Sequence, residues 1–544
     1  MTKQMNDPEN ALLHSQDQQS LSAYVRSYFQ RLASGDLGSM PIIIGIIAIA
    51  IIFQFQNSNF LTARNFVNLI LQMAGITMIA YGVVFVLLLG EIDLSIGYVS
   101  GIGGVAVALL LRDPALGWTW YTAIPAGLLA TAAIGLLQGL IITYFQVPSF
   151  IVTLAGLLAW NGVVLRMIGG SGTVIIQDDV VRGIAGDFLP AFTTTVNDLT
   201  LPIQQRVPML LDLSFLAPLD VNVAGITISW WVWAILALIG VGLALQLVTR
   251  AINYQGSTTR LYLMVYGALL VLALAVAVFN IRVPDVEFVP DDNYRAAIRT
   301  VDDRVSELNQ DIPHIYNIGR LTLSWGQLTL LAFVAAYAVI QVFAYYNRKS
   351  QGLNTRPLPL LAFQVISLSV LALLVAHVSD QDRGVPVVGL ILLIFLVVLT
   401  FVTNNTQFGR FVYAVGGNPE AARRAGINVR RIRVIVFILS STLAGMGGII
   451  LASRLGSVAT NAGGGNILLN SIAAAVIGGT SLFGGRGRIS SAVLGALVIA
   501  SVDNGMGLLD LSSGDKFVIT GIVLLVAVIV DSLSLRRQQQ SGIA

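Results

Sequence analysis

Two carboxylates interrupt apolar sequence in the first fifth of the chain. Glu91 and Asp93, in the stretch Gly90-Glu-Ile-Asp-Leu-Ser-Ile-Gly97, stand between two apolar runs and have no Lys or Arg beside them. A carboxylate among apolar residues at membrane depth is costly, so it should line a cavity, pair with another group or lie at an interface. The alternative is structural, with Asp93 and Ser95 capping the helix that runs on to Leu111 and doing nothing else.

Polar groups elsewhere in apolar sequence are sparse. Asp503 and Asn504 lie in Val502-Asp-Asn-Gly-Met506, and Asn161 follows Trp160 inside another apolar run. No run of Asp, Glu, His or Lys indicates a proton relay, so transient hydrogen bonds to a neutral polar solute suit these groups better than an ion pathway. The plainer alternatives are a helix end for Asp503 and Asn504, and packing against a neighbour for Asn161. The side chains predicted to line a substrate path are Glu91, Asp93, Ser95, Asn161, Asp503 and Asn504.

Several other kinds of chemistry are excluded by the residue types. The chain has no cysteine, and its three histidines (His14, His314 and His377) are far apart in sequence, which argues against a metal site. Its three lysines are not preceded by glycine, so it has no phosphate-binding loop. We therefore predict no catalytic residue, no metal site and no cofactor, and any ATP hydrolysis must occur on a partner.

Composition indicates what must position these groups. Hydrophobic residues make up 56% of the chain and charged residues 11%, with a mean hydropathy of +0.80, whereas soluble proteins have about 25% charged residues. Repeated apolar runs predict an all-α, polytopic transmembrane bundle of about fourteen hydrophobic segments, with the N- and C-termini cytoplasmic. The net charge of +3 does not indicate nucleic acid, because the arginines cluster in short loops. The polar start lacks the pattern of a cleaved signal peptide.

The expected spans lie at about 38–56, 66–89, 97–111, 119–143, 148–168, 226–248, 261–281, 322–346, 358–378, 386–403, 434–453, 467–482, 489–510 and 515–534. This order divides the chain into a polar lead (1–36), an N-terminal transmembrane core (37–168), a variable region (169–385), a C-terminal core (386–537) with a cytoplasmic loop (405–433), and a tail (538–544).

Loop charges agree with that topology. The segment 407–433 carries six arginines and one acid and is placed inside, whereas the acid-rich segments 169–225 and 282–320 are placed outside. Within 282–320, residues 293–309 have charges at helical spacing and could form a solvated helix.

A further polar island, Gly416–Arg433, lies between two long apolar runs. Asn418 is suited to cap a helix, Pro419 to begin it, Glu420 to the positive end of its dipole and Gly426 to end it in a left-handed conformation. The spacing predicts a helix of two turns. So short a helix is marginal alone in water, so it should lean on something outside the membrane. The alternative is an ordinary arginine-rich loop that merely fixes topology.

The sequence Glu420-Ala421-Ala422 followed by Gly426 resembles the EAA loop of ABC importer permeases. The surrounding stretches, Tyr413-Ala-Val-Gly-Gly-Asn418 and Ile472–Gly487, resemble the monosaccharide branch of that family, and the stretches at 90–97, 148–156 and 502–506 resemble its xylose type. The resemblance covers about 60–168 and 380–537, while the region 250–350 exceeds the family's usual pattern. It implies that the loop contacts an ATP-binding subunit through Gly417, Asn418, Glu420, Ala421, Ala422 and Gly426.

The same resemblance implies a permease of the bacterial inner membrane that imports a monosaccharide, D-xylose or a similar pentose. Its implied partners are a cytoplasmic ATPase, an extracytoplasmic sugar-binding protein, a second copy of the chain and membrane lipid. The residues alone leave two other classes open. A secondary sugar carrier or facilitator would need no ATPase, and a membrane-embedded enzyme is disfavoured because no nucleophile, base and acid come together in the sequence.

Overall fold

The computed structural model describes residues 40–112, 118–189, 221–223, 226–228, 325–350, 358–512, 514–522 and 525. The polar lead, the predicted span at 261–281, the predicted helix at 293–309 and the tail lie outside the described residues, as do most of the spans expected at 226–248 and 515–534.

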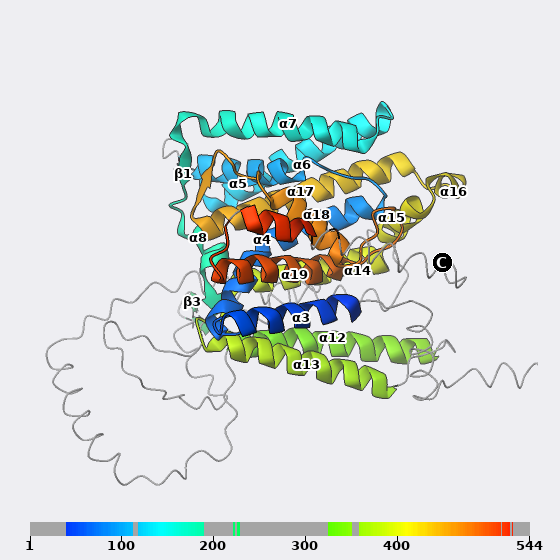
Figure 1. Cartoon of the computed structure of the whole chain (residues 1–544). Helices are drawn as coiled ribbons and strands as arrows, with labels where there is room; N and C mark the ends of the chain where they lie inside the picture. The colour runs from blue at the N-terminus through cyan, green and yellow to red at the C-terminus, as the bar shows by residue number, and fades with distance from the viewer. Residues whose placement is uncertain are drawn as a thin grey trace, which may run out of the picture.

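Long apolar helices lie side by side with nearly parallel axes (Figure 1). In the described part of the chain, seven helices are long and apolar enough to cross a membrane. This confirms the polytopic all-α fold, while the total of fourteen segments and the side on which the termini lie stay predictions. The helices are α3 (Met40–Gln56), α4 (Ala63–Leu88), α5 (Ile96–Arg112), α6 (Trp120–Tyr144), α7 (Ser149–Ile168), α8 (Asp179–Gly186), α12 (Trp325–Ser350), α13 (Leu358–Asp380), α14 (Val387–Asn405), α15 (Gln407–Gly417), α16 (Pro419–Arg424), α17 (Val429–Leu455), α18 (Ile467–Ile477) and α19 (Ile489–Leu508).

The core forms around α17, which packs against α4, α5 and α6. Small residues make these contacts close. A Cβ on Gly103 of α5 would come within 2.6 Å of the Cα of Gly445, and one on Gly82 of α4 within 2.7 Å of the Ser440 carbonyl oxygen. Without a hydrophobic driving force between helices in lipid, such close backbone packing is a main source of association. The helices α3, α7, α12 and α13 lie toward the outside of the bundle (Figure 1).

The two ends of the bundle differ. At one end, here called the strand end, β1 (Thr173–Ile175) pairs antiparallel with β6 (Ser457–Ala459), and β2 (Phe188–Leu189) pairs with β5 (Val385–Pro386). The helices α15 and α16 lie at the opposite end, here called the loop end (Figure 1). A further antiparallel pair joins β3 (Val221–Val223) to β4 (Ile226–Ile228).

The expected span at 467–482 is wrong in length. Helix α18 ends at Ile477, so its 11 residues reach about 17 Å, short of the roughly 30 Å of hydrocarbon. The glycines that follow explain the end, because Gly479, Gly484 and Gly485 all have positive φ angles, at 96°, 85° and 71°, which glycine adopts readily.

The expected span at 226–248 is also wrong at its start, where residues 226–228 form strand β4. The alternation of Val221-Asn-Val223 and Ile226-Thr-Ile228 favours paired strands over a helix at this point.

Candidate functional site

Helix α16 begins as the sequence predicts. Asn418 is its N-cap, in an extended conformation, and its side-chain oxygen accepts a hydrogen bond of 2.9 Å from the backbone N–H of Ala421. Pro419 occupies the first turn, where its missing N–H leaves no partner unsatisfied. The helix spans six residues, slightly less than the two turns expected.

Gly426 ends this helix as expected. Its φ angle is +81°, its N–H donates to the Arg423 carbonyl, and the next N–H, of Ile427, donates to the Ala422 carbonyl, both at 3.0 Å. These two bonds form a Schellman motif, which satisfies carbonyls that a helix end leaves open. A Cβ at Gly426 would meet nothing within 4 Å, so only the backbone conformation demands glycine here.

The two alanines of α16 face different ways. Ala422 is buried and joins the main core cluster, whereas Ala421 and Glu420 are exposed. Ala422 therefore fixes the helix to the bundle, and its contact with an ATP-binding subunit stays a prediction. The exposed Glu420 lies 3.5 Å from Arg424 one turn later, a surface pair of little energetic weight.

A cluster of glycines ties the loop end to the helices, here called the glycine junction (Gly90, Gly416, Gly417, Gly484 and Gly485). The N–H of Gly485 donates to the Leu88 carbonyl at 2.9 Å, at the end of α4. A Cβ on Gly416 would overlap that same oxygen, and a Cβ on Gly484 would come within 2.7 Å of the Gly416 carbonyl. Backbone thus meets backbone from three distant segments.

A tyrosine reinforces this junction. The hydroxyl of Tyr413, on α15, donates to the carbonyl of Gly487 at 2.9 Å. Burial raises the pKa of Tyr413, an effect that the nearby charge of Arg488 opposes. The hydroxyl therefore stays protonated as a donor.

Glu91 and Asp93 lie beside the glycine junction, between α4 and α5. Glu91 forms an ion pair with Arg433 of α17, with 3.0 Å between Oε1 and Nε. This partner could not be predicted from the sequence alone, because Glu91 and Arg433 lie far apart along the chain.

Asp93 is buried and accepts hydrogen bonds at the start of α5. Its Oδ1 accepts from the backbone N–H and the hydroxyl of Ser95, at 2.9 and 2.6 Å. The Ser95 hydroxyl in turn accepts from Nε2 of Gln138, on α6, at 2.8 Å. This geometry agrees with the capping alternative and extends it, because the cap also joins α5 to α6.

Asn161 lies on α7, toward the outside of the bundle, and is half-buried. Its neighbour Trp160 packs against the core. The predicted contact of Glu91, Asp93, Ser95 and Asn161 with substrate stays a prediction, and none of the four lines the cavity described next.

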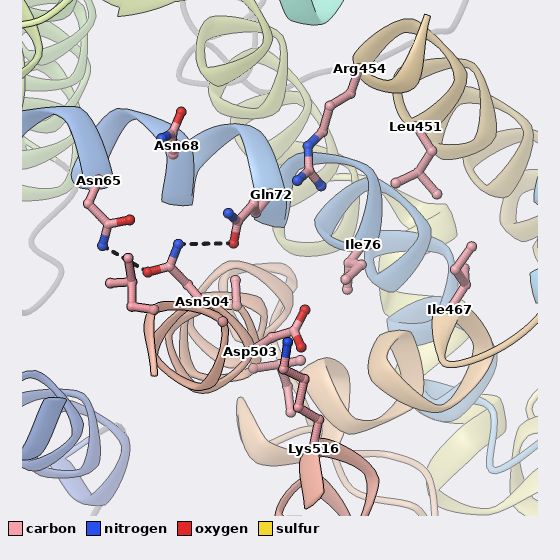
Figure 2. A pocket seen from close by; sticks show the side chains of 14 residues that line it. Asn65, Asn68, Gln72, Ile76, Leu451, Arg454, Ile467, Asp503, Asn504 and Lys516 are labelled. Atoms are coloured by element: carbon pink, nitrogen blue, oxygen red, sulfur yellow. Dashed lines mark hydrogen bonds between the residues drawn. The ribbon is translucent and has the colours of Figure 1, made fainter. Parts of the chain in front are cut away.

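A cavity of about 390 Å³, here called the amide cavity, opens among α4, α17, α18 and α19. Figure 2 shows the side chains of Asn65, Gln72 and Asn504 turned toward one another, with Lys516 beside Asp503. Of the predicted path residues it contains Asp503 and Asn504, near the end of α19. The lining residues are Asn65, Asn68, Gln72, Ile76, Leu451, Arg454, Ile467, Ile499, Ala500, Asp503, Asn504, Gly507, Leu508 and Lys516.

Amides form a chain along one wall of this cavity. Nδ2 of Asn65 donates to Oδ1 of Asn504 at 2.8 Å, and Nδ2 of Asn504 donates to Oε1 of Gln72 at 3.3 Å (Figure 2). Asn65 also caps the turn before α4, since its Nδ2 donates to the Phe60 carbonyl. Asn504 is thus held at both ends of its amide.

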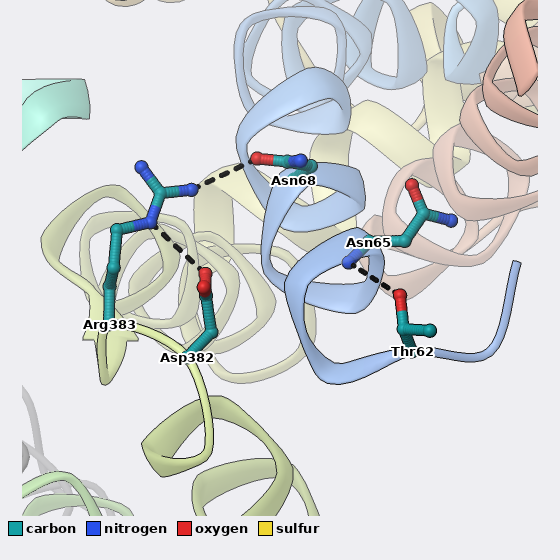
Figure 3. A network of polar contacts seen from close by, with 5 residues as sticks. All are labelled: Thr62, Asn65, Asn68, Asp382 and Arg383. Carbon is teal, nitrogen blue, oxygen red and sulfur yellow. Dashed lines mark hydrogen bonds and ion pairs between the residues drawn. The ribbon is translucent and has the colours of Figure 1, made fainter. Parts of the chain in front are cut away.

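The rim of the cavity is held by an arginine from the α13–α14 connection. Nη2 of Arg383 donates to Oδ1 of Asn68 at 3.0 Å, while its Nε pairs with Asp382 at 3.0 Å (Figure 3). The guanidinium also lies 4.5 Å above the ring of Phe188, a favourable cation–π distance.

Sequence reasoning missed the amides of α4. The signal was available, because Asn65, Asn68 and Gln72 follow one another at i, i+3 and i+7, which places them on one helix face. Their chemistry is that of hydrogen bonding, and no group of three His, Asp or Glu side chains that could hold a metal forms among the described residues.

Comparisons with known proteins match the chain to transport permeases, as the sequence motifs predict. A family model described as the permease component of the branched-chain amino acid transport system matches residues 318–528. The xylose transport system permease XylH of Escherichia coli K12 is 30% identical over 94% of this chain and 95% of its own length. No solved structure matches the chain.

Two further relatives are a XylH of Haemophilus influenzae and a ribose permease. The first is 29% identical over 91% of this chain and 96% of its own length. The ribose import permease RbsC of Bacillus subtilis is 44% identical over 27% of this chain and 46% of its own length.

Proposed function

The chain belongs to the family of monosaccharide ABC-transporter permeases, and we propose that it is the membrane-spanning subunit of an importer driven by a separate cytoplasmic ATPase. The sugar is D-xylose or a similar pentose, delivered by an extracytoplasmic binding protein. The working unit contains two copies of this chain in the bacterial inner membrane.

The main support for docking of an ATPase is the structure of α16. It is a capped helix of six residues that projects at the loop end, with Ala421 and Glu420 exposed and Ala422 anchored in the core. A helix this short is marginal alone, so its two caps and its buried alanine indicate a fixed shape that a partner recognises. The arginine-rich surroundings support a cytoplasmic location for this end.

The choice of substrate is supported by the relatives and by the cavity. Full-length relatives are named for xylose transport. In the proposed path, Asp503 and Asn504 meet the sugar in the amide cavity at the strand end, which is then the extracytoplasmic end. No observation favours a secondary carrier over this function.

The proposal is tested by two substitutions in α16 in the chain expressed with its ATPase partner. Gly426→Val forces a β-branched residue into a left-handed conformation, and Ala421→Trp places bulk on the exposed face. Both should leave membrane insertion intact but reduce ATPase co-purification and xylose uptake together, by about tenfold for the loss of about 1.4 kcal/mol of docking energy.

Gly186→Val is the matched control. Gly186 is exposed at the strand end, and a Cβ there meets nothing within 4 Å, so docking and uptake should be unchanged. Normal docking with normal uptake in both α16 variants would show that the ATPase contacts another part of the chain.

A further inference from the structure

The polar atoms that line the amide cavity and have no hydrogen-bond partner in the part of the protein that the structure describes define which ligand it can bind. Gln72 accepts from Asn504 through Oε1, which leaves its Nε2 to donate. Asn68 accepts from Arg383 through Oδ1, which leaves its Nδ2 to donate. Within the described residues neither of these nitrogens has a hydrogen-bond partner in the protein. The two donors come from adjacent turns of α4 and line the same cavity (Figure 2).

Charged groups add an acceptor and further donors. Asp503, exposed on α19, contributes a carboxylate, and Arg454 and Lys516 contribute cations. A carboxylate accepts hydrogen bonds, whereas guanidinium and ammonium groups only donate. A ligand satisfied here must both donate and accept at several closely spaced positions, which adjacent hydroxyl groups do.

The rest of the wall is apolar. Ile76, Leu451 and Ile467 lie beside the polar groups and suit the C–H face of a ring. The volume of about 390 Å³ falls at the lower end of the roughly 300–1,000 Å³ of small-molecule sites. A single small ring with its hydroxyls fits this size.

We infer that the amide cavity is a binding site for one neutral monosaccharide ring, whose hydroxyls are read by Gln72 and Asn68 on α4 and by Asp503 on α19. This inference rests on the proposed function and adds to it the residues that select the ligand. The fixed amide chain from Asn65 through Asn504 orients Gln72, so that Asn65 and Asn504 act as positioning residues.

Charge favours a neutral ligand over an ion. A cation would meet Arg454 and Lys516, and one carboxylate among the lining residues does not offset both. An anion could pair with Arg454 or Lys516, but the carboxylate of Asp503 among the same lining residues would repel it. The hydroxyls of a neutral polyol can accept from the amide and cationic donors and donate to Asp503, and a neutral ring is repelled by none of these charges.

The test uses a thiol reporter, since the chain has no cysteine. Gly507 lines the cavity, is exposed, and has nothing within 4 Å of the position of a Cβ. Gly507→Cys in the full chain, in membrane vesicles, should react with a charged water-soluble maleimide, and D-xylose should slow that reaction. Gly186→Cys, at an exposed glycine outside the cavity with equally open space, is the control and should react at the same rate with and without sugar.

Two variants on the reporter background assign the residues. Gln72→Leu and Asp503→Asn should each raise the D-xylose concentration for half-protection by about tenfold, as expected for a lost hydrogen bond to a polar ligand. Gln381→Leu, on an exposed glutamine of the α13–α14 connection outside the cavity, should leave it unchanged.

Three outcomes overturn the inference: no protection by D-xylose, D-ribose or D-glucose; equal protection at Gly186→Cys; or protection by inorganic phosphate or gluconate in place of neutral sugars. Uptake is measured in the same vesicles with ATPase and binding protein present. ATP-dependent uptake without protection contradicts the site alone, whereas protection without ATP-dependent uptake contradicts the proposed function alone.

Discussion

The loop end and the amide cavity are built by opposite means. At the loop end, backbone meets backbone, as in the bond from Gly485 to Leu88, and the helix α16 is set by caps a few residues apart. In the cavity, side chains of α4 come together with those of α17, α18 and α19, which lie hundreds of residues later in the sequence. The loop end is therefore intolerant of added atoms at Gly416 and Gly484, whereas the cavity depends on which polar atoms are present.

The largest effect is expected at the glycine junction. In Gly416→Ala, the new Cβ overlaps the Leu88 carbonyl oxygen and comes within 2.9 Å of the Gly485 nitrogen. Both are backbone atoms, so the strain of overpacking, typically about 1–3 kcal/mol and occasionally more, cannot be relieved by turning a side chain. We expect a lower midpoint of thermal unfolding in detergent and a lower yield of folded chain.

The neighbouring glycine offers a matched control. A Cβ at Gly417 would meet nothing within 4 Å, so Gly417→Ala should unfold at the same temperature as the native chain. Equal midpoints for the two variants would show that the junction is looser than its backbone contacts imply.

A smaller effect is expected at the ion pair between Glu91 and Arg433, which lies beside the same junction. Its side chains are 13% and 31% exposed, so Glu91→Gln should lower the free energy of unfolding by about 1 kcal/mol, at the upper end of the range for accessible pairs. The side chains of the surface pair Glu420 and Arg424 are 68% and 81% exposed. Glu420→Gln should therefore change the free energy of unfolding little.

A double-mutant cycle with Arg433→Gln measures the pair itself. Additive effects of Glu91→Gln and Arg433→Gln would contradict a direct interaction. A non-additive result would show that the stretch from 90 to 97 acts at the loop end, through a partner that the sequence does not reveal.

The contrast between the two regions explains what could be predicted. The cap at Asn418, the proline after it and the left-handed Gly426 depend on neighbours within eight positions, so the sequence alone was enough. The apolar runs likewise predicted the helices, because hydrocarbon requires them. The length of α18 was missed because an apolar run extends across Gly478 and Gly479, where the close approach of Ser491 and a positive φ end the helix.

The cavity was predicted in part. Asp503 and Asn504 could be predicted as candidate site residues because they are polar groups in apolar sequence. The hydrogen bonds of Asn504 to α4 could not, since only folding brings Asn65 and Gln72 to it. The burial of Ala422 in the bundle was not predicted, because burial cannot be read from an alanine in a polar loop. The pairing of Glu91 with Arg433 was not predicted either, because the two residues are distant in sequence.

The most local effect is expected at the cap of α16, and it tests whether the two ends are independent. Asn418→Ala removes the acceptor for the Ala421 N–H, which should cost about 1 kcal/mol in the local stability of the helix. Hydrogen exchange of the backbone amides of 421–425 should then be about fivefold faster at that cost, while Asn418→Asp, which keeps the acceptor, should restore the native rate. In the chain without ATPase, sugar protection of the Gly507→Cys reporter should not change, because the side-chain hydrogen bond that is lost lies within α16. A shift in protection with Asn418→Ala would mean that the loop end and the amide cavity are already coupled in the permease alone, through α4 and α17, before any partner binds.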